Sequence, residues 1–195
     1  MKAFPPDPQT ERVSEVIEWR PNLRTAVLWN LLAVPLMLGG LLLFFRLATL
    51  PLGAGVTAVF RPVDILLILL VTVVVAAALL AAHEGLHGLV MAAFGARPRF
   101  GGLMIARLVP ALFTTAPGHR FTRPQYLAVA LTPAAFISAL GSLACLTPVG
   151  LYMVVPLAFH FAGCVGDFSA TVRLLKEPRG TLCEDLRDGI RFYRP

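Results

Sequence analysis

The amino-acid sequence predicts an all-α membrane protein with about four transmembrane helices, and three observations lead to this fold class. Of its 195 residues, 57% are hydrophobic and only 14% are charged. The mean hydropathy of +0.75 lies well above that of ordinary soluble domains. Four apolar segments are long enough to span a bilayer, and they cover residues 26–45, 63–94, 126–146 and 149–167.

The regions outside the spans are short and polar. Residues 1–25 form a lead with mixed charges and several prolines, which does not resemble a cleaved signal peptide. Within this lead, residues 14–18 indicate a short interfacial helix. Residues 168–195 form a charged tail, in which residues 184–194 are expected to be a solvated helix. The segment between them, residues 26–167, is the predicted membrane domain.

The first two spans carry signals for their packing and for their start. The first contains the pair Gly39-Gly40, which can kink a membrane helix or let a neighbour pack closely. Pro62 and Asp64 open the second, where proline suits the first turn and a carboxylate stabilises the positive end of the helix. We therefore interpret Asp64 as a helix cap rather than as a functional residue.

The connection between the second and third spans has a different pattern. Gly95 suits the end of the second helix. Residues 100–118 are apolar but interrupted by glycine and proline, so they are too broken for a span, and we expect short strand-like or re-entrant structure there. The third span contains Gly141 and Ser142, which offer small surfaces for helix packing.

The distribution of basic residues predicts how the chain is oriented. Fifteen of its seventeen lysines and arginines lie in residues 1–25, in the connection between spans two and three, or after Asp167. With four spans, these three regions share one side of the membrane, and an excess of positive charge marks the cytosolic side. We therefore expect a multi-pass protein of the cell membrane with both termini in the cytosol.

The cysteines and the net charge exclude other classes of protein. Cys145, Cys164 and Cys183 show no paired short spacing, which argues against a disulfide framework and against a thiolate metal site. The net charge of +6 is carried by residues that flank the spans, so it reflects membrane orientation. Nothing in the sequence matches a nucleic-acid-binding motif, and we expect no nucleic-acid partner.

Three polar side chains interrupt the second span in the order His83-Glu84-Gly85-Leu86-His87. An ionised carboxylate at the centre of a membrane helix costs about 2.5–3.5 kcal/mol, so these groups require partners. Histidines four residues apart project from one helix face and can ligate one zinc ion, with the glutamate beside a bound water. At 1.5 Å per residue the motif lies about 30 Å along its helix, in the cytosolic leaflet.

A catalytic zinc ion takes three protein ligands and keeps one position open, so a third ligand must come from another segment. Asp167 lies about 27 Å along the fourth span, close to the depth of the motif. His160, two turns away on the same helix face, is the alternative third ligand, and His119 is a weaker one. We therefore predict the ligands His83 and His87 together with Asp167 or His160, and Glu84 as the catalytic base.

Two parts of the sequence resemble a bacterial family of membrane zincin peptidases, a domain of unknown function that carries His-Glu-x-x-His. They are residues 83–88 with 94–101, and Gly166-Asp167 with residues 185–193. At a coarser level the chain is similar to site-2 proteases, whose zinc helix is completed by an aspartate on a later span. The Asn-Pro-x-x-Asp form common in that group is not present. The resemblance implies three ligands and one base: His83, His87 and Asp167, with Glu84.

The sequence thus predicts an intramembrane zinc metalloprotease that hydrolyses peptide bonds of membrane-associated substrates near the cytosolic face. Its expected cofactor is Zn²⁺, and its expected partners are the lipid bilayer and a membrane protein or peptide substrate, held by strand addition to residues 100–118. The alternative is a non-catalytic membrane protein with a structural or regulatory metal site, such as an inactive protease relative. A structural site needs no unliganded carboxylate beside its ligands, so Glu84 favours catalysis.

Overall fold

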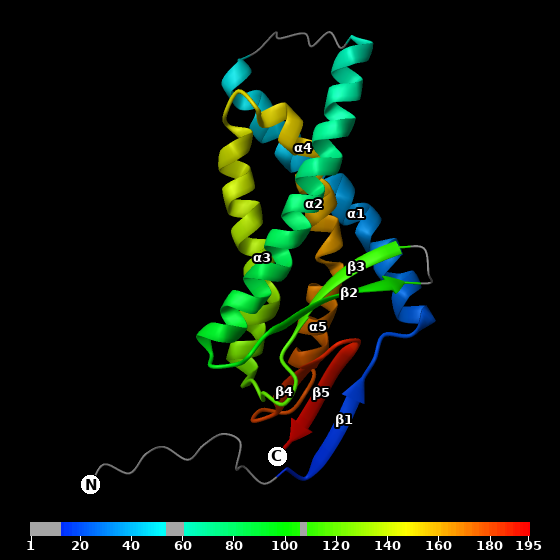
Figure 1. The fold of residues 1–195 in the computed structure, drawn as a ribbon, viewed down its shortest axis with the longest axis vertical. Helices are drawn as coiled ribbons and strands as arrows, with labels where there is room; N and C mark the ends of the chain where they lie inside the picture. Colours follow the sequence, from blue (N-terminus) through cyan, green and yellow to red (C-terminus); the bar gives the residue numbers. More distant parts are fainter. Residues whose placement is uncertain (1–12, 54–60, 106–108) are drawn as a thin grey trace, which may run out of the picture. The chain divides into compact units, whose positions relative to one another are not determined.

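The computed structural model describes residues 13–53, 61–105 and 109–195. It is mostly helical and confirms the predicted fold class, because the described residues include four helical segments long and apolar enough to cross a membrane. The elements in chain order (Figure 1) are β1 (Glu15–Trp19), α1 (Leu23–Thr49), the 3-10 helix η2 (Leu50–Leu52), α2 (Pro62–Ala93), β2 (Arg99–Ile105), β3 (Val109–Thr115), α3 (Arg123–Cys145), α4 (Gly150–Gly163), α5 (Val165–Leu175), β4 (Leu182–Leu186) and β5 (Gly189–Arg194).

The chain divides into two compact units according to its internal contacts. The helical unit comprises Thr25–His83 and Pro133–Gly166. The sheet unit comprises Glu84–Thr132, Asp167–Pro195 and the described part of Met1–Arg24. The fourth helical segment consists of α4 and α5, which are separated only by Cys164, so helical structure runs eight residues past Asp167.

Small residues let the helices of the helical unit approach closely. A Cβ atom on Gly40 of α1 would lie 3.2 Å from the Cα atom of Ala158 in α4. A Cβ atom on Gly141 of α3 would lie 2.4 Å from a methyl carbon of Leu157. Gly40 and Gly141 therefore serve helix packing within the protein, whereas a Cβ atom on Gly39 would meet nothing within 4 Å.

The start of α2 has the capping geometry that the sequence predicts. The backbone N–H of Arg61 donates to the Oδ2 atom of Asp64 at 2.8 Å, and the guanidinium of Arg61 forms an ion pair with the same carboxylate at 3.1 Å. Asp64 thus satisfies backbone and side-chain donors at the positive end of the helix. Its interpretation as a cap is confirmed.

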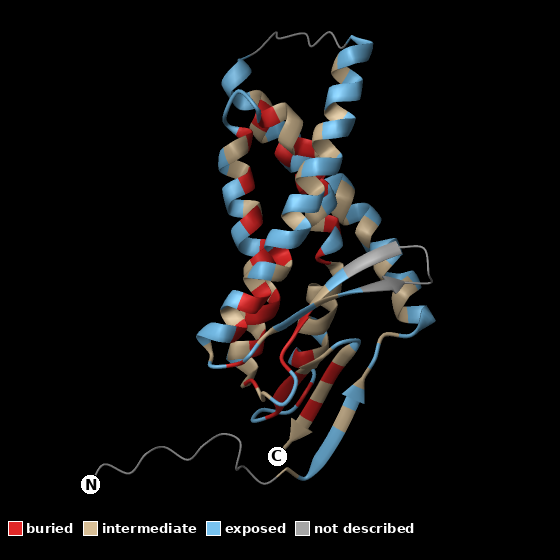
Figure 2. Cartoon of the chain, in the orientation of Figure 1, coloured by how far each residue is buried: buried red, intermediate tan, exposed pale blue. Residues whose placement is uncertain are grey.

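Two antiparallel sheets belong to the sheet unit. One has the order β1-β5-β4, with Glu15 opposite Arg194 and Asp185 opposite Ile190. Its central strand β5 alternates between buried and half-buried residues, as Figure 2 shows. The other sheet is the hairpin of β2 and β3. This hairpin occupies the connection predicted to be strand-like, although residues 106–108 lie outside the described part of the chain.

The helices expected at residues 14–18 and 184–194 are wrong, because both segments are strands. The serine and glutamates of the first segment resemble a helix start, but Val16, Ile17 and Trp19 also suit a strand. In the second segment, Ile190 and Phe192 alternate with polar residues after an Asp-Gly pair, a pattern typical of a hairpin. Gly189 is needed there, since a Cβ atom would lie 2.2 Å from the carbonyl oxygen of Trp19.

An apolar core holds the described part of the sheet unit together. It contains side chains from α2, α3, α5, β4, β5 and the segment before α3, and Phe121 and Phe192 are completely buried within it. Phe121 also exchanges two backbone hydrogen bonds with Cys183 of β4, at 2.7 and 2.8 Å. The C-terminal sheet is therefore joined to the segment that leads into α3.

A buried carboxylate, Glu177, ties the central strand β5 to the end of α5. Its side chain is fully buried and accepts from Nε of Arg194 at 2.7 Å, and it also forms an ion pair with Arg173. Burial alone would raise the pKa of Glu177, but the hydrogen bond from Arg194 and the positive charge of Arg173 hold this pKa below the ordinary value of 4.5. The ionised form is thus favoured by the folded state.

Glu177→Gln should destabilise the protein at pH 7 by about 1–3 kcal/mol, because it removes a charged acceptor from buried donors. A carboxylate with a depressed pKa contributes stability above its ordinary pKa and loses it as the pH falls through the folded-state value. The difference between wild type and variant should therefore shrink below pH 4.5. Thermal unfolding in detergent, followed by tryptophan fluorescence, measures both effects.

The matched control is Glu15→Gln, which removes the other carboxylate paired with Arg194. The Glu15 side chain is 55% exposed, so this pair should contribute little. Equal losses of stability in the two variants, or a loss in Glu177→Gln that does not vary with pH, would contradict the assignment.

Candidate metal centre

The polar motif of the second span lies on one turn of α2. His83, Glu84 and His87 each offer one ligand atom, and these atoms all lie within 4.8 Å of one another. Both histidines are only 9% exposed, whereas Glu84 is half-buried. This arrangement follows from helix geometry, since residues three and four positions apart share a face. The structure thus brings together the two histidines and the glutamate that the sequence singles out.

His87 is held by a backbone carbonyl of α3. Its Nδ1 atom lies 2.9 Å from the carbonyl oxygen of Val129. Because a carbonyl can only accept, Nδ1 carries the proton in this bond and Nε2 keeps its lone pair. Metal-ligating histidines almost always donate their other ring N–H in this way, so the contact fixes both the tautomer and the ring orientation.

Asp167 lies in the first turn of α5 and reaches the same histidine. Its Oδ1 atom is 3.4 Å from Nε2 of His87, and its side chain is 20% exposed. Asp167 was expected to lie near the motif, and the residue of the motif that it approaches is His87. His119, the weakest of the candidate ligands, instead packs its ring against Phe121 at a centroid distance of 4.5 Å.

His160, the alternative third ligand, contacts His83. Nε2 of His160 lies 3.1 Å from Nδ1 of His83, and the two rings meet edge to face at 5.2 Å between centroids. The Sγ atom of Cys164 is 4.0 Å from Nδ1 of His83 and 3.9 Å from Nε2 of His160. All three cysteines are buried thiols. The sequence argued against thiolate ligands, and the spacing of His160 and Cys164, four residues apart, is the signal that could have identified this group.

The β2–β3 hairpin is attached to α2 beside the motif. The hydroxyl of Thr114 in β3 donates to the backbone carbonyl of Glu84 at 2.9 Å. One turn later, Gly88 leaves room for the ring of Phe100 in β2, since a Cβ atom there would lie 2.4 Å from the ring. Neither contact was anticipated from the sequence, because one uses a backbone carbonyl and the other the absence of a side chain.

A further carboxyl group, that of Asp185 in β4, is half-buried in the sheet unit, where the sequence suggested only a solvated tail. Asp185 of β4 accepts a hydrogen bond from the hydroxyl of Tyr126 at 2.8 Å, and Thr115 donates to its backbone carbonyl at 2.6 Å. Burial disfavours the carboxylate and raises the pKa of Asp185 to about 7. Tyr126 lies one turn before Val129 in α3, so this pair belongs to the surroundings of His87.

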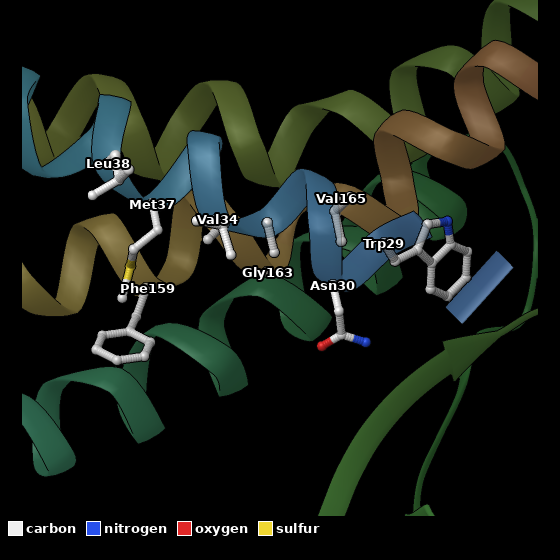
Figure 3. A pocket seen from close by; sticks show the side chains of 10 residues that line it. Trp29, Asn30, Val34, Met37, Leu38, Phe159, Gly163 and Val165 are labelled. Carbon is white, nitrogen blue, oxygen red and sulfur yellow. The ribbon is translucent and has the colours of Figure 1, made fainter. Parts of the chain in front are cut away.

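An apolar cavity of about 560 Å³ lies in the helical unit between α1 and α4. Trp29, Asn30, Val34 and Met37 line it from α1, and Phe159 and Gly163 line it from α4 (Figure 3). Phe159 precedes His160 in the sequence, so α4 presents one face to the cavity and another to His83. The cavity therefore borders the helix that supports the first histidine of the motif.

The donor set of the motif fits a zinc ion. Tetrahedral zinc with bonds of 2.0–2.1 Å to nitrogen and oxygen places neighbouring ligand atoms about 3.3–3.4 Å apart. The 3.4 Å between Nε2 of His87 and Oδ1 of Asp167 matches this separation. Nitrogen and carboxylate donors with a histidine N–H directed to a carbonyl are the donor set and supporting contact typical of catalytic zinc sites.

The described residues thus combine four helical segments that are long and apolar enough to cross a membrane with a His-Glu-x-x-His turn whose side chains could hold a metal ion. The chain belongs to the family described as putative zincin peptidase, whose model matches residues 76–182, more than half of its length. This confirms the family resemblance noted in the sequence and supports a metallopeptidase. No curated protein and no solved structure matches the chain.

Zinc binding by variants should distinguish the candidate ligands from Glu84, the candidate base. In protein that also carries Cys164→Ser, so that zinc is not held beside His160, His87→Ala should lose zinc, and Asp167→Asn should weaken zinc affinity by at least about tenfold, because each removes a charged or imidazole donor. Glu84→Gln should retain zinc. Zinc content after dialysis against a weak chelator, measured by mass spectrometry of the metal, checks each variant.

Asp188→Asn is the control, because this exposed carboxylate pairs with Arg20 at the sheet. Its zinc content should equal that of the wild type. Loss of zinc in Glu84→Gln, or full retention in Asp167→Asn, would show that the ligand set has been assigned incorrectly.

Proposed function

We propose that this protein is an intramembrane zinc metalloprotease that hydrolyses peptide bonds of membrane-associated substrates near the cytosolic face. The single observation that carries the proposal is the turn of α2 on which Glu84 lies between two histidines whose ligand atoms cluster with its carboxylate. Family membership supports the metallopeptidase class. The apolar composition of the helices supports a site within the membrane.

The proposed ligands are His83, His87 and Asp167, with Glu84 left to act as a base. Asp167 is preferred to His160 because its carboxylate lies at ligand spacing from His87, whereas His160 contacts the other histidine. When bound, zinc supplies Lewis acidity that lowers the pKa of a coordinated water to about 7 and polarises the scissile carbonyl.

The remaining chemistry belongs to side chains of this protein. Glu84 accepts the proton of the attacking water and returns it to the amine that leaves, so its carboxylate acts first as general base and then as general acid. Its half-buried position is compatible with access for water. The Val129 carbonyl keeps the His87 ring from rotating while the charges in the site change.

The hairpin of β2 and β3 is the proposed binding edge for substrate. A helical substrate shields its own backbone, so it must be extended before cleavage, and strand addition holds an extended chain through main-chain hydrogen bonds. The hydroxyl of Thr114 links this hairpin to the carbonyl of Glu84. We therefore expect a strand added to this hairpin to lie beside the turn of α2 that carries His83, Glu84 and His87.

The proposal includes a multi-pass arrangement in the cell membrane with both termini in the cytosol. It rests on the concentration of lysine and arginine in three regions that share one side in a four-span chain. The catalytic turn, far along α2 from its start at Pro62, then lies toward the cytosolic leaflet.

Glu84→Gln should lower cleavage by a factor on the order of 10²–10⁴, because it removes the general base without removing a ligand. The experiment uses purified full-length protein in detergent with a library of membrane-segment peptides, and cleavage is scored by mass spectrometry. Asp64→Asn, which changes the capping carboxylate of the same helix, is the matched control and should cleave as the wild type does.

The protease proposal would be overturned if the wild type and Glu84→Gln both held a full complement of zinc and cleaved the peptides at the same low rate. That result would instead support the non-catalytic alternative, in which the metal site is structural or regulatory.

Thr114→Val should lower cleavage about tenfold while zinc content stays constant, because it removes the bond that aligns the hairpin with Glu84. Thr49→Val is a suitable comparison, since the Thr49 hydroxyl bonds only to carbonyls of its own helix among the contacts of the described residues. Unchanged cleavage in Thr114→Val would separate the hairpin from catalysis.

A further inference from the structure

A second group of candidate metal ligands lies wholly within the helical unit. It consists of His83, His160 and Cys164, whose ligand atoms lie within 4.8 Å of one another. The nitrogen atoms of the two histidines are 3.1 Å apart, and the sulfur atom lies 4.0 and 3.9 Å from them. Of these residues, the proposed protease mechanism uses only His83.

The fold of α4 accounts for this convergence. His160 occupies the last turn of the helix, and Cys164 is the residue that ends it, so the two side chains share one face at a spacing of four residues. Cys164 is completely buried and His83 is only 9% exposed. The thiol donates to the carbonyl of His160 at 3.3 Å, within its own helix, and its sulfur faces both imidazoles.

The spacing of the three atoms is close to that of a tetrahedral site. With bonds of 2.0–2.1 Å to nitrogen and about 2.3 Å to sulfur, zinc separates two nitrogen ligands by about 3.3 Å and a nitrogen from a sulfur by about 3.6 Å. The distances between His83, His160 and Cys164 depart from these values by a few tenths of an ångström. Small side-chain adjustments would complete the geometry, and the thiol proton would leave for solvent on binding.

We propose that His83, His160 and Cys164 form a second metal position that takes a thiophilic cation such as Zn²⁺ or Cu⁺. One thiolate and two imidazoles make a soft donor set, which favours these cations over Mg²⁺ or Ca²⁺. Because His83 belongs to both groups, a metal ion bound here competes with the first position for the same imidazole. This competition would inhibit the enzyme, a consequence that rests on the proposed protease function, whereas the metal position itself does not.

The direct test is the absorption spectrum of the metal-free, full-length protein during titration with Co²⁺. A thiolate bound to Co²⁺ produces a charge-transfer band in the near ultraviolet. The band should appear in the wild type and in Glu84→Gln, should vanish in Cys164→Ser, and should need at least about tenfold more Co²⁺ in His160→Ala. Cys145→Ser, which changes another buried cysteine of the helical unit, should keep the band.

Absence of the band in folded wild-type protein, or its persistence in Cys164→Ser, would overturn the proposal. The first result would leave His160 as a residue that only orients His83 through a hydrogen bond. Because the band is read without substrate and also in Glu84→Gln, failure of the metal position is distinguishable from failure of the protease proposal.

The inhibitory consequence has its own measurement. In the wild type and in Cys145→Ser, the cleavage rate at excess Zn²⁺ should be at most one tenth of the rate at equimolar Zn²⁺. In Cys164→Ser the ratio of these two rates should stay near one. Equal inhibition of all three proteins would show that excess zinc acts elsewhere and would overturn the regulatory part.

Discussion

A polar group inside an apolar helix must find its partner within the protein, since hydrocarbon offers none. Helix α2 has few polar side chains, and the two histidines of its polar turn meet this constraint through different elements. His83 contacts His160 of α4. His87 contacts the Val129 carbonyl of α3 and the carboxylate of Asp167 in α5. The polar turn therefore determines which residues the neighbouring helices must supply.

The C-terminal sheet also contributes to the surroundings of His87. In the sheet unit, the end of β3 and the segment after it are joined to β4. The Thr115 hydroxyl donates to the Asp185 carbonyl, and the Gly118 N–H donates to the Glu184 carboxylate. Tyr126 then links the Asp185 carboxyl group to α3, one turn before the carbonyl that holds His87. The strands thus support the surroundings of a ligand candidate through backbone and side-chain bonds, in addition to the apolar core.

Much of this architecture could be predicted from the sequence, because the relevant signals are local. The length of the apolar segments predicts the helices. A spacing of four residues predicts that the two histidines of the motif share a helix face, and Asp64 indicates where α2 begins. A count of helix rise was enough to pair Asp167 with the motif, since both lie at similar positions along their helices. The first three inferences need only the pattern within one segment, and the pairing of Asp167 needs only the length of two helices.

The features that the sequence did not predict are contacts with residues distant in sequence or with backbone groups, which no residue type identifies. Strands β1 and β5 pair across most of the chain, so residues 14–18 looked like a helix start when they were considered alone. The Val129 carbonyl and the Glu84 carbonyl could not be identified because any residue supplies such an acceptor. The spacing between cysteines carries no signal for Cys164, because its neighbour in the structure is a histidine four residues earlier.

The pairing of Glu15 with Arg194 also bears on when the protein matures during synthesis. Ribosomes extend the chain from its N-terminus, so β1 is made long before the strand that completes its ladder. The helices can enter the membrane as they emerge, but β1 has no partner until residues through Arg194 have been translated. The three-stranded sheet is therefore assembled after translation of the spans, and the surroundings of His87 are completed only then. A peptidase built in this order would remain incomplete while its own nascent chain is still exposed.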